Sequence, residues 1–397
     1  MGENRKRKKK LVLKIAANTW ENASRDIREL SVVQELGADV LVMAKGGKTG
    51  VQEKIGGFTV YRMSTRPLGK CVPKGINRII SIFTWAYQVR KFRPDVISGH
   101  NLVPLFIGWL SLCFQEKRKR PKLVYDSHEF TIYDGEKTRL QIFFTKCLEG
   151  FLIRRCAFTI EVNDLIADEV QKIHNLKQRP VVVRNIPEKW TVDPDVCQKV
   201  RKQIMSSFEG GGKEYFLLMY HGGVMPDRGI ERLIYLVSIN PELAAVVLGN
   251  GEESYIKNLK KWAQQLLVSD RVCFCKAVPQ TELWKYVGAV DLGMILASSI
   301  NKNYLYSLPN KFFENIQSET PVICPDYPAM RQIIEHYGNG VTCNPMKFTE
   351  INHWVEQLRT DSKFYQKYKT NTKKAKEILC WENEKNALKK AYIGLLG

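Results

Sequence analysis

Short apolar runs alternate with longer amphipathic patterns along the first half of the chain. The apolar runs are rich in Val and Ile and predict strands at residues 11–16, 39–44, 58–63, 96–98, 122–126, 158–162 and 181–183. The longer patterns predict helices at residues 24–36, 76–92, 102–114, 138–155 and 164–174. Strands of this kind, each followed by a helix, favour a parallel sheet that is covered on both faces.

The alternation stops and then begins again. Residues 188–212, which end in a glycine run, predict a linker between two domains, 11–187 and 213–375. The second domain has predicted strands at 215–220, 244–248, 272–275, 292–296 and 322–324, and predicted helices at 229–239, 254–265, 282–287, 309–318 and 330–336. An amphipathic helix at 376–397 is expected to pack back toward the first domain. The pattern predicts an α/β protein with two doubly wound parallel sheets, facing across a cleft that would bind the ligand.

Charge is distributed unevenly along the 397 residues, whose formal net charge is +20. Residues 1–187 contain 34 Lys and Arg against 18 Asp and Glu, a net charge of +16, so the remainder carries only +4. This excess indicates an anionic partner for the first domain. A nucleic acid is disfavoured because the sequence has no nucleic-acid recognition motif. Residues 1–10 predict a disordered basic arm, and deleting residues 2–10 should weaken binding to anionic liposomes.

Two predicted helices of the first domain suit a membrane surface. Residues 76–92 and 141–155 combine aromatic and basic side chains, and residues 117–120 form a basic loop. The long apolar run at 102–114 is too short to span a bilayer, and no signal peptide is apparent. None of the ten cysteines forms a C-x-x-C pair, which is typical of a reducing compartment and argues against a zinc site. We therefore expect a cytoplasmic protein that associates peripherally with the inner face of the cell membrane.

A predicted helix that starts near Pro309 carries the most specific chemistry. Lys311 and Glu314 lie three residues apart, on one face close to the helix N-terminus. A helix N-terminus beside a cation binds phosphate, and a carboxylate one turn further can accept hydrogen bonds from the vicinal hydroxyls of a ribose. The pattern therefore predicts a nucleoside-diphosphate site.

Several motifs, in order along the chain, resemble those of the retaining GT-B glycosyltransferases of family 4. The second domain carries them at residues 220–224 (YHGGV), 228–234 (RGIERLI), 247–252 (VLGNGE), 291–293 (DLG) and 308–328. The first domain carries looser matches at residues 95–101 (DVISGHN), 124–129 (VYDSHE) and 181–187 (VVVRNIP). The resemblance implies the two-domain GT-B fold and transfer of a sugar from a nucleotide sugar.

The resemblance also assigns the donor site in the second domain. It implies that Arg228 binds the donor diphosphate, with Lys311 replacing a basic residue that many relatives carry at Gly223. It implies that Glu314, the second acid of the family's glutamate pair, holds the ribose hydroxyls, whereas Tyr306 stands where relatives carry the first acid, near the sugar. Other residues expected to bind the donor are Gly222, Gly223, Tyr306, Asn310 and Val278 of the second domain and Asn18 of the first.

In the first domain the resemblance points to the ends of two strands. His128 matches a histidine that relatives place over the sugar ring, so His128, Arg228 and Lys311 are the catalytic candidates. His100 is a second sugar-side candidate, and Glu129 is expected to contact the acceptor. Relatives approach the diphosphate with a Gly-Gly loop after the first strand. The corresponding loop here lacks that pair, so Asn18, Ser24 and Arg25 are the candidate donors of hydrogen bonds.

The expected activity is sugar transfer from a nucleoside-diphosphate sugar, with UDP first and GDP second, to a glycan or lipid-linked acceptor. The expected product keeps the anomeric configuration, and the pathway is expected to be polysaccharide assembly. No cofactor or metal is expected, because Arg228 and Lys311 would stabilise the leaving diphosphate. The alternatives are an epimerase of the same fold, a phosphorylase, for which the chain is short, and a non-catalytic nucleotide-sugar-binding scaffold. The acid missing at Tyr306 motivates the scaffold alternative.

Overall fold

The computed structural model describes residues 9–21, 23–113, 115–116, 118, 120–208, 213–298 and 301–397. The chain divides into two compact units, Met1–Arg184 with Lys385–Gly397 and Asn185–Glu384. Most of the expected basic arm, half of the basic loop at 117–120 and the glycine run at 210–212 lie outside the described residues.

The first unit contains an eight-stranded sheet in the order β3-β4-β2-β1-β5-β6-β7-β8. Every pairing is parallel except that of β3 with β4. The strands are β1 (Leu11–Ala16), β2 (Asp39–Lys45), β3 (Gln52–Ile55), β4 (Phe58–Met63), β5 (Val96–His100), β6 (Lys122–Asp126), β7 (Phe158–Glu161) and β8 (Val181–Val182). Consecutive strands run to either side of β1, so the order reverses between β1 and β5.

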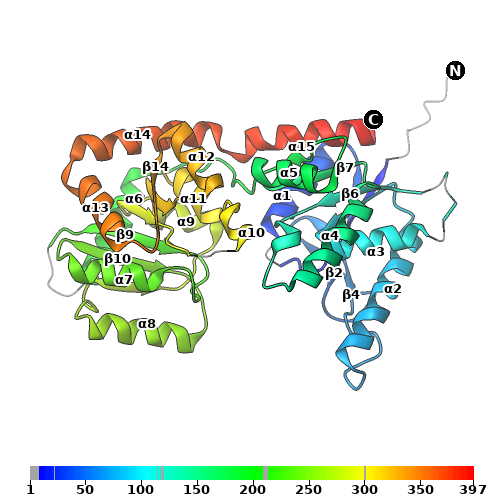
Figure 1. Cartoon of the computed structure of the whole chain (residues 1–397), viewed down its shortest axis with the longest axis horizontal. Coiled ribbons are helices and arrows are strands. Elements are labelled where there is room, and N and C mark those ends of the chain that lie inside the picture. Colours follow the sequence, from blue (N-terminus) through cyan, green and yellow to red (C-terminus); the bar gives the residue numbers. More distant parts are fainter. Residues whose placement is uncertain are drawn as a thin grey trace. The chain divides into compact units, whose positions relative to one another are not determined.

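Helices flank this sheet (Figure 1). They are α1 (Ser24–Glu35), α2 (Lys74–Phe92), α3 (Leu102–Leu112), α4 (Arg139–Ile153) and α5 (Asp164–His174), with the 3₁₀ turn η2 (Thr131–Tyr133). Local sequence fixes several of the helix starts. Thr138 and Gln141 form a reciprocal capping box at α4, and the Asn163 side chain accepts a hydrogen bond from the Ile166 amide at α5.

The second unit contains a six-stranded parallel sheet in the order β11-β10-β9-β12-β13-β14. Its strands are β9 (Phe216–His221), β10 (Leu243–Leu248), β11 (Val272–Cys275), β12 (Leu292–Met294), β13 (Val322–Pro325) and β14 (Gly340–Cys343). Here the order reverses between β9 and β12. All six residues of β10 are buried, as expected for a strand covered on both faces. The doubly wound α/β architecture predicted from the sequence is confirmed in both units.

The helices of the second unit are α6 (Pro194–Ser206), α7 (Ile230–Ile239), α8 (Glu253–Gln265), α9 (Leu283–Val287), α10 (Lys302–Leu305), α11 (Asn310–Gln317), α12 (Pro328–Tyr337), α13 (Phe348–Thr360) and α14 (Ser362–Ile378), with the 3₁₀ turn η3 (Gln280–Glu282). The prediction that residues 188–212 form a linker is wrong for α6, because this helix is part of the second unit. Pro194 occupies the first turn of α6 and the Asp193 side chain caps it, so this proline begins a helix rather than breaking one.

The last helix, α15 (Trp381–Leu396), follows a break at residues 379–380, so the expected single helix at 376–397 is interrupted. From Lys385 onward its residues belong to the first unit. Lys389 pairs with Glu35 of α1 at 2.7 Å, and the ring of Tyr392 lies 5.2 Å from that of Phe158 on β7.

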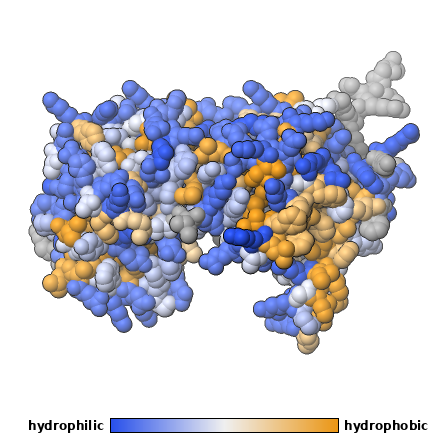
Figure 2. All heavy atoms as spheres, viewed as in Figure 1, coloured by the Kyte–Doolittle hydropathy of each residue, from blue (hydrophilic) through white to orange (hydrophobic). Residues whose placement is uncertain are grey.

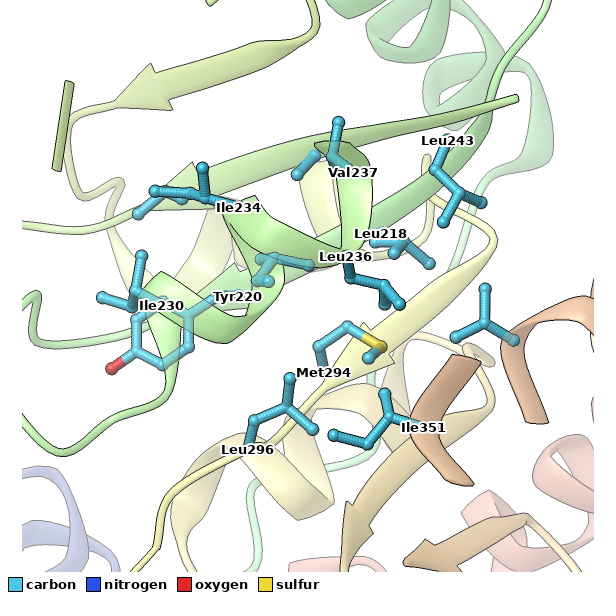
Figure 3. Packing of buried hydrophobic residues seen from close by; sticks show 14 of the residues in the cluster. Leu218, Tyr220, Ile230, Ile234, Leu236, Val237, Leu243, Met294, Leu296 and Ile351 are labelled. Atoms are coloured by element: carbon cyan, nitrogen blue, oxygen red, sulfur yellow. The ribbon is translucent and has the colours of Figure 1, made fainter. Parts of the chain in front are cut away.

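The main hydrophobic cluster of the second unit joins α7 to the sheet. Ile230, Ile234 and Val237, spaced along one face of α7, pack with Leu218 and Tyr220 of β9 in a fully buried group (Figure 3). This packing fixes the position of β9 and of the loop that follows it. Among the described residues, no helix combines the length and the apolar character needed to cross a bilayer.

Two strands were not predicted from the sequence. β3 has the sequence QEKI, in which three exposed polar residues precede the half-buried Ile55, so it lacks the apolar alternation that marks a strand. It pairs with β4 through a hairpin at Gly56 and Gly57. β14 begins with glycine, which is a poor strand former. Each extends its sheet without changing the position of the strand ends discussed below.

Candidate functional site

Doubly wound sheets bind ligands at the carboxyl ends of their strands, close to the point where the strand order reverses. In the first unit this point lies between β1 and β5, and His100 is the last residue of β5. In the second unit it lies between β9 and β12, and β9 ends at His221, directly before Gly222 and Gly223. The structure therefore places the motif residues of each unit where this fold builds its ligand sites.

The loop after β9 is held by unusually close backbone contacts. A Cβ atom at Gly249 would lie 1.8 Å from the carbonyl oxygen of Gly222, and one at Gly251 would lie 2.0 Å from that of Val224. Gly222 itself has a φ of 114°, a conformation that side chains disfavour. The glycines of the 222–223 and 249–251 motifs are thus required by packing, and they leave backbone exposed at Gly222 and Gly223.

Lys311 lies directly beside this loop. Its Nζ is 3.7 Å from the centroid of the Tyr220 ring, a cation–π geometry, and a Cβ at Gly222 would lie 3.5 Å from the same Nζ. Burial, followed by the nearby positive charge of Arg228, lowers the pKa of Lys311 to about 7. Within the part of the chain that the structure describes, Lys311 has no carboxylate within ion-pairing distance. A desolvated ammonium of this kind would gain from binding an anion.

Glu314 lies one turn along the same helix, α11, as predicted from the spacing. One of its carboxylate oxygens is 3.0 Å from Nε2 of His221, which is buried at the end of β9. This contact orients the carboxylate, while about 12% of the Glu314 side chain remains exposed. The other carboxylate oxygen is therefore free of this particular contact and could accept hydrogen bonds from a ligand.

Arg228 is half-buried and precedes Gly229, the residue that caps α7. A Cβ at Gly229 would lie 2.3 Å from the carbonyl oxygen of Leu296, so the turn requires glycine. The Arg228 guanidinium carbon is 5.5 Å from the centroid of the Tyr304 ring. The Arg228 charge lowers the pKa of Lys311. Burial raises the pKa of Tyr220 to about 12, although the Arg228 charge opposes this rise. The structure thus brings Arg228, Lys311 and Glu314 into one region of the second unit.

The remaining candidates of the second unit have different surroundings. The Asn310 side-chain oxygen accepts a hydrogen bond of 2.6 Å from the side-chain amide of Asn185. Tyr306, where relatives carry an acid, is half-buried, and Lys302 Nζ lies 5.5 Å from its ring centroid. Val278 is partly buried against the hydrophobic cluster beneath the sheet. No contact places Val278 beside Lys311 or Glu314.

His100, at the end of β5, and His128, two residues beyond the end of β6, come together in the first unit. Their ring centroids are 3.7 Å apart, with the planes inclined at 38°. His100 Nδ1 lies 3.1 Å from both carboxylate oxygens of Asp26, and His128 Nε2 lies 3.0 Å from Asp126 Oδ2. The backbone amide of His128 donates to the side chain of Asn101 at 2.9 Å. Both imidazoles are therefore oriented by carboxylates.

A buried cluster of charges lies beneath these histidines. Lys14, in the middle of β1, lies 2.9 Å from Asp26 and contacts Asp126, and all three side chains are almost fully buried. Burial opposes the charge on each of them. The attraction between the ammonium and the carboxylates outweighs it, raising the pKa of Lys14 and lowering those of Asp26 and Asp126. Lys14 thus acts as an internal counter-ion that keeps both carboxylates ionised.

This environment keeps His128 neutral. Burial lowers its pKa to about 4, and the attraction of Asp126 only partly offsets that effect. Because Asp126 is ionised, we infer that Nε2 of His128 carries the proton and donates a hydrogen bond to that carboxylate. Nδ1 of His128 is then a hydrogen-bond acceptor. A neutral imidazole at this position can bind a hydroxyl but does not supply a positive charge.

The same cluster has the composition of a metal site. Asp26, His100 and His128 offer ligand atoms within 4.8 Å of one another, as do Asp26, Glu29, Asp126 and His128. The Lys14 ammonium, however, lies against both aspartates. It already supplies a positive charge between them, so this arrangement alone does not indicate a metal.

Three other expectations concern the first unit. As a whole residue Glu129 is exposed beside His128, but its carboxyl group is partly buried. This partial desolvation, together with a hydrogen bond to Asp134, raises the pKa of Glu129 to about 7. Asn18 follows β1, and its side-chain oxygen accepts from the Trp20 amide at 3.0 Å. Arg25 was wrongly named as a ligand donor, because its buried guanidinium bonds to Glu29 at 2.8 Å and lies 3.4 Å from Asp126.

Sequence reasoning missed Lys14, Asp26 and His221 as parts of these sites. A signal for Lys14 was present, because a lysine within the apolar strand LVLKIA must find a buried counter-ion. His221 could have been suspected from its place between a buried strand and the Gly-Gly pair. Asp26 carried no such signal, since an acid in the first turn of a helix is common at the surface.

Comparison with known families agrees with this arrangement. Residues 202–375 match the family model described as glycosyl transferases group 1. Residues 30–186 match the model described as glycosyltransferase family 4. Each unit therefore contains a region that matches a glycosyltransferase family model. No curated protein matches the chain.

Solved structures show that the chain has the GT-B fold. The HepE protein of Anabaena in complex with UDP has a TM-score of 0.75 at 14% identity, covering 97% of this chain and 99% of that one. Sucrose-phosphate synthase from Thermosynechococcus elongatus also reaches 0.75, at 13% identity, covering 98% and 99%. The catalytic domain of starch synthase IV from Arabidopsis thaliana, bound to ADP and acarbose, reaches 0.70 at 12% identity, covering 98% and 99%. At these identities the likeness establishes the fold.

Proposed function

We propose that this protein transfers a sugar from a nucleoside-diphosphate sugar to an acceptor hydroxyl, with retention of the anomeric configuration. The glycosyltransferase-family domains support the reaction class, and the structural neighbours include proteins crystallised with UDP, UDP-glucose or ADP. Retention is the expectation for the family that the motifs resemble. UDP is the first choice of donor nucleotide and GDP the second.

The observation that carries the proposal is the position of Lys311. Its ammonium is half-buried beside Gly222 and over the Tyr220 ring, without an ion pair among the described residues. Arg228 is near enough to lower its pKa. Two positive charges held close together, with only partial compensation from Glu314, are electrostatically unfavourable until an anion binds. The anion that we expect to bind at this position is the diphosphate of a nucleotide-sugar donor.

In the proposed reaction the glycosidic bond to the diphosphate breaks as the acceptor hydroxyl attacks the anomeric carbon from the same face, and the hydroxyl proton passes to the departing diphosphate oxygen. Negative charge develops on the leaving diphosphate, and Arg228 and Lys311 stabilise it. Glu314 holds the ribose hydroxyls. Neutral His128 accepts a hydrogen bond from the sugar, with His100 beside it and Glu129 toward the acceptor. No metal is assigned, because Arg228 and Lys311 supply the positive charge for the leaving diphosphate, while Lys14 already balances the aspartates of the first unit.

We further propose that the acceptor is a glycan or lipid-linked glycan intermediate of polysaccharide assembly. The enzyme would then work in the cytoplasm at the inner face of the cell membrane. The concentration of positive charge in the first 187 residues supports an anionic surface as the place of work.

A panel of UDP- and GDP-sugars tests the proposal. The purified protein is incubated with each donor, with and without acceptor and chelator, and nucleoside diphosphate release is measured. Release that resists the chelator and is lost in the Arg228→Ala/Lys311→Ala double variant is expected, and proton NMR of the product reports its anomeric configuration. Tight donor binding without release would favour a non-catalytic scaffold. Conversion of the donor sugar without transfer would favour an epimerase.

A further inference from the structure

Helix α4 turns its apolar side away from the protein. Five large apolar residues follow the helical spacing i, i+3, i+4, i+8 and i+11, the pattern that normally faces a core. All five are exposed, by 37% to 64%: Leu140, Phe143, Phe144, Leu148 and Phe151. The buried positions of α4 include Glu149 and Gly150 instead. Among the described residues of this unit, the apolar stripe therefore stays largely exposed.

Buried polar contacts hold α4 in this orientation. Glu149 receives a hydrogen bond from the Tyr125 hydroxyl at 2.9 Å, and its other oxygen lies 2.8 Å from Nε2 of His174. Rotating the helix to bury its phenylalanines would separate Glu149 from both partners and leave buried polar groups without hydrogen bonds. The buried hydrogen bonds of Glu149 thus keep the apolar stripe of α4 exposed.

Helix α2 repeats the arrangement. Ile76, Ile79, Phe83 and Tyr87 form an exposed stripe, each at least 49% exposed. Asn77, on the opposite side, is buried and bonds to the backbone of Leu68, Gly69 and Val72.

The two stripes belong to neighbouring helices. Helix α3 packs against both α2 and α4, and the Trp109 ring of α3 lies 5.1 Å from that of Phe151. Hydrophobic residues gather in Figure 2 over the region where Figure 1 places α4, α3 and α2. We call the nine exposed apolar residues of α2 and α4, together with the basic residues beside them, the aromatic–basic face.

The charges beside the stripes are all positive on the exposed surface of these helices. α2 contains no acid, and the single acid of α4 is the buried Glu149. The exposed basic residues of the two helices and the turn after α4 are Lys74, Arg78, Arg90, Lys91, Arg139, Lys146, Arg154 and Arg155. Two of them contact the aromatic rings directly: Lys91 Nζ lies 4.7 Å from the Tyr87 ring centroid, and the Arg155 guanidinium lies 3.6 Å from that of Phe151.

We propose that the aromatic–basic face docks the protein onto an anionic lipid bilayer, with the apolar stripes entering the interface and the basic residues contacting lipid phosphates. Helices with aromatic residues on one side and Lys or Arg beside them have the composition of interfacial helices. A second copy of this chain would bring like charges together, which favours the bilayer as the occupant. The proposal deepens the membrane location proposed above and specifies the residues that make it.

Vesicle co-sedimentation of the full-length protein tests the apolar stripes. The vesicles contain phosphatidylcholine alone or mixed with phosphatidylglycerol. Wild type should bind the mixed vesicles. The Phe143→Ser/Phe144→Ser variant should bind at least about tenfold more weakly, because it lacks two rings that would enter the bilayer. The matched control is Ile239→Ser/Ile378→Ser, which removes two exposed apolar residues of the second unit and should bind like wild type.

A charge-matched pair tests the basic residues. Arg78→Glu/Lys146→Glu and Lys261→Glu/Lys363→Glu change the net charge equally, and all four residues are exposed. Each basic residue near an anionic surface is worth about fivefold in binding, so only the first pair should weaken it substantially. Wild type and all variants carry the same basic arm, so differences in vesicle binding between them come from the aromatic–basic face.

Equal binding by the face variants and their controls would overturn the proposal. So would binding to pure phosphatidylcholine that matches binding to the mixed vesicles. If wild type sediments as a dimer that the phenylalanine substitutions dissociate, while vesicle binding is unchanged, the face joins copies instead. None of these readouts uses turnover. Nucleotide release with a soluble acceptor should be the same in the face variants as in wild type, so failure of this proposal and failure of the proposed activity can be distinguished.

Discussion

The ammonium of Lys311 lies 3.7 Å above the centre of the Tyr220 ring. The ring faces it from β9 and the lysine comes from α11, so two elements remote in sequence set the position of one charge. The ring attracts the cation, but it cannot replace the water that burial removes, and the pKa of Lys311 accordingly falls to about 7. This single relationship leads to two pH-dependent predictions.

The first prediction concerns nucleotide binding. Above pH 7 the free protein has a neutral Lys311, so binding of UDP should require uptake of a proton. Affinity should therefore fall by up to about tenfold per pH unit as the pH rises from 7 to 9. The Lys311→Arg variant should lose this dependence, and Lys311→Met should bind about a hundredfold more weakly at pH 7. Calorimetry in two buffers with different ionisation heats measures the proton uptake, and an unchanged uptake in Lys311→Met would contradict the assignment.

The second prediction concerns stability. The pKa of Lys311 in the folded protein is below its ordinary value of 10.5. Between about pH 7 and 10.5 the unfolded chain therefore binds more protons at this position, so the free energy of unfolding should rise with pH in that window. Relative to Lys311→Met, wild type should gain stability between pH 7 and pH 9 in urea denaturation. A parallel pH profile for the two proteins would argue against the lowered pKa.

Glu314 is expected to recognise the ribose of the donor. Wild type should bind UDP at least about tenfold more tightly than 2′-deoxy-UDP, because the missing hydroxyl leaves the carboxylate without its partner. The Glu314→Gln variant, which keeps an acceptor for His221, should bind both nucleotides with similar, weaker affinity. Glu335→Gln changes an exposed acid of the same unit and serves as the control. Full discrimination by Glu314→Gln would remove the ribose assignment.

Lys14 is expected to be essential for the stability of the first unit. Replacing it with methionine leaves Asp26 and Asp126 buried without their counter-ion, which should lower the free energy of unfolding by about 3–5 kcal/mol. Lys54→Met, at an exposed position of β3, should change it by less than about 0.5 kcal/mol. Combining Lys14→Met with Asp126→Asn should recover part of the loss. A small effect of Lys14→Met in chemical denaturation would show that the cluster is not tightly coupled.

His128 should make the protein sensitive to mild acid. Its pKa of about 4 in the folded protein is below the ordinary 6.5, so its stabilising contribution is present above pH 6.5 and is lost as the pH falls toward 4. This contribution amounts to up to about 3 kcal/mol. His128→Asn should therefore lose less stability than wild type between pH 6.5 and 4.5. Equal losses, measured by denaturation at both pH values, would contradict a buried neutral histidine.

Much of this architecture could be predicted from the chain itself. Runs such as residues 243–248, buried throughout, and the helix at Asn310–Gln317 follow directly from local sequence. The pairing of Glu314 with His221 could not be predicted, because it depends on how α11 packs beside β9. The same holds for the outward stripe of α4. Its spacing predicts an amphipathic helix, but only the buried bonds of Glu149 determine which side faces solvent.

The hairpin strand β3 has a consequence for self-association. Without it, β4 would be the last strand of the first sheet, with a row of unpaired backbone groups open to another chain. β3 covers that row by pairing from Gln52 to Ile55, and it presents Glu53 and Lys54 at the new edge, where charged side chains discourage further pairing. A short, mainly polar segment outside the core thus protects the edge of the sheet from pairing with another chain.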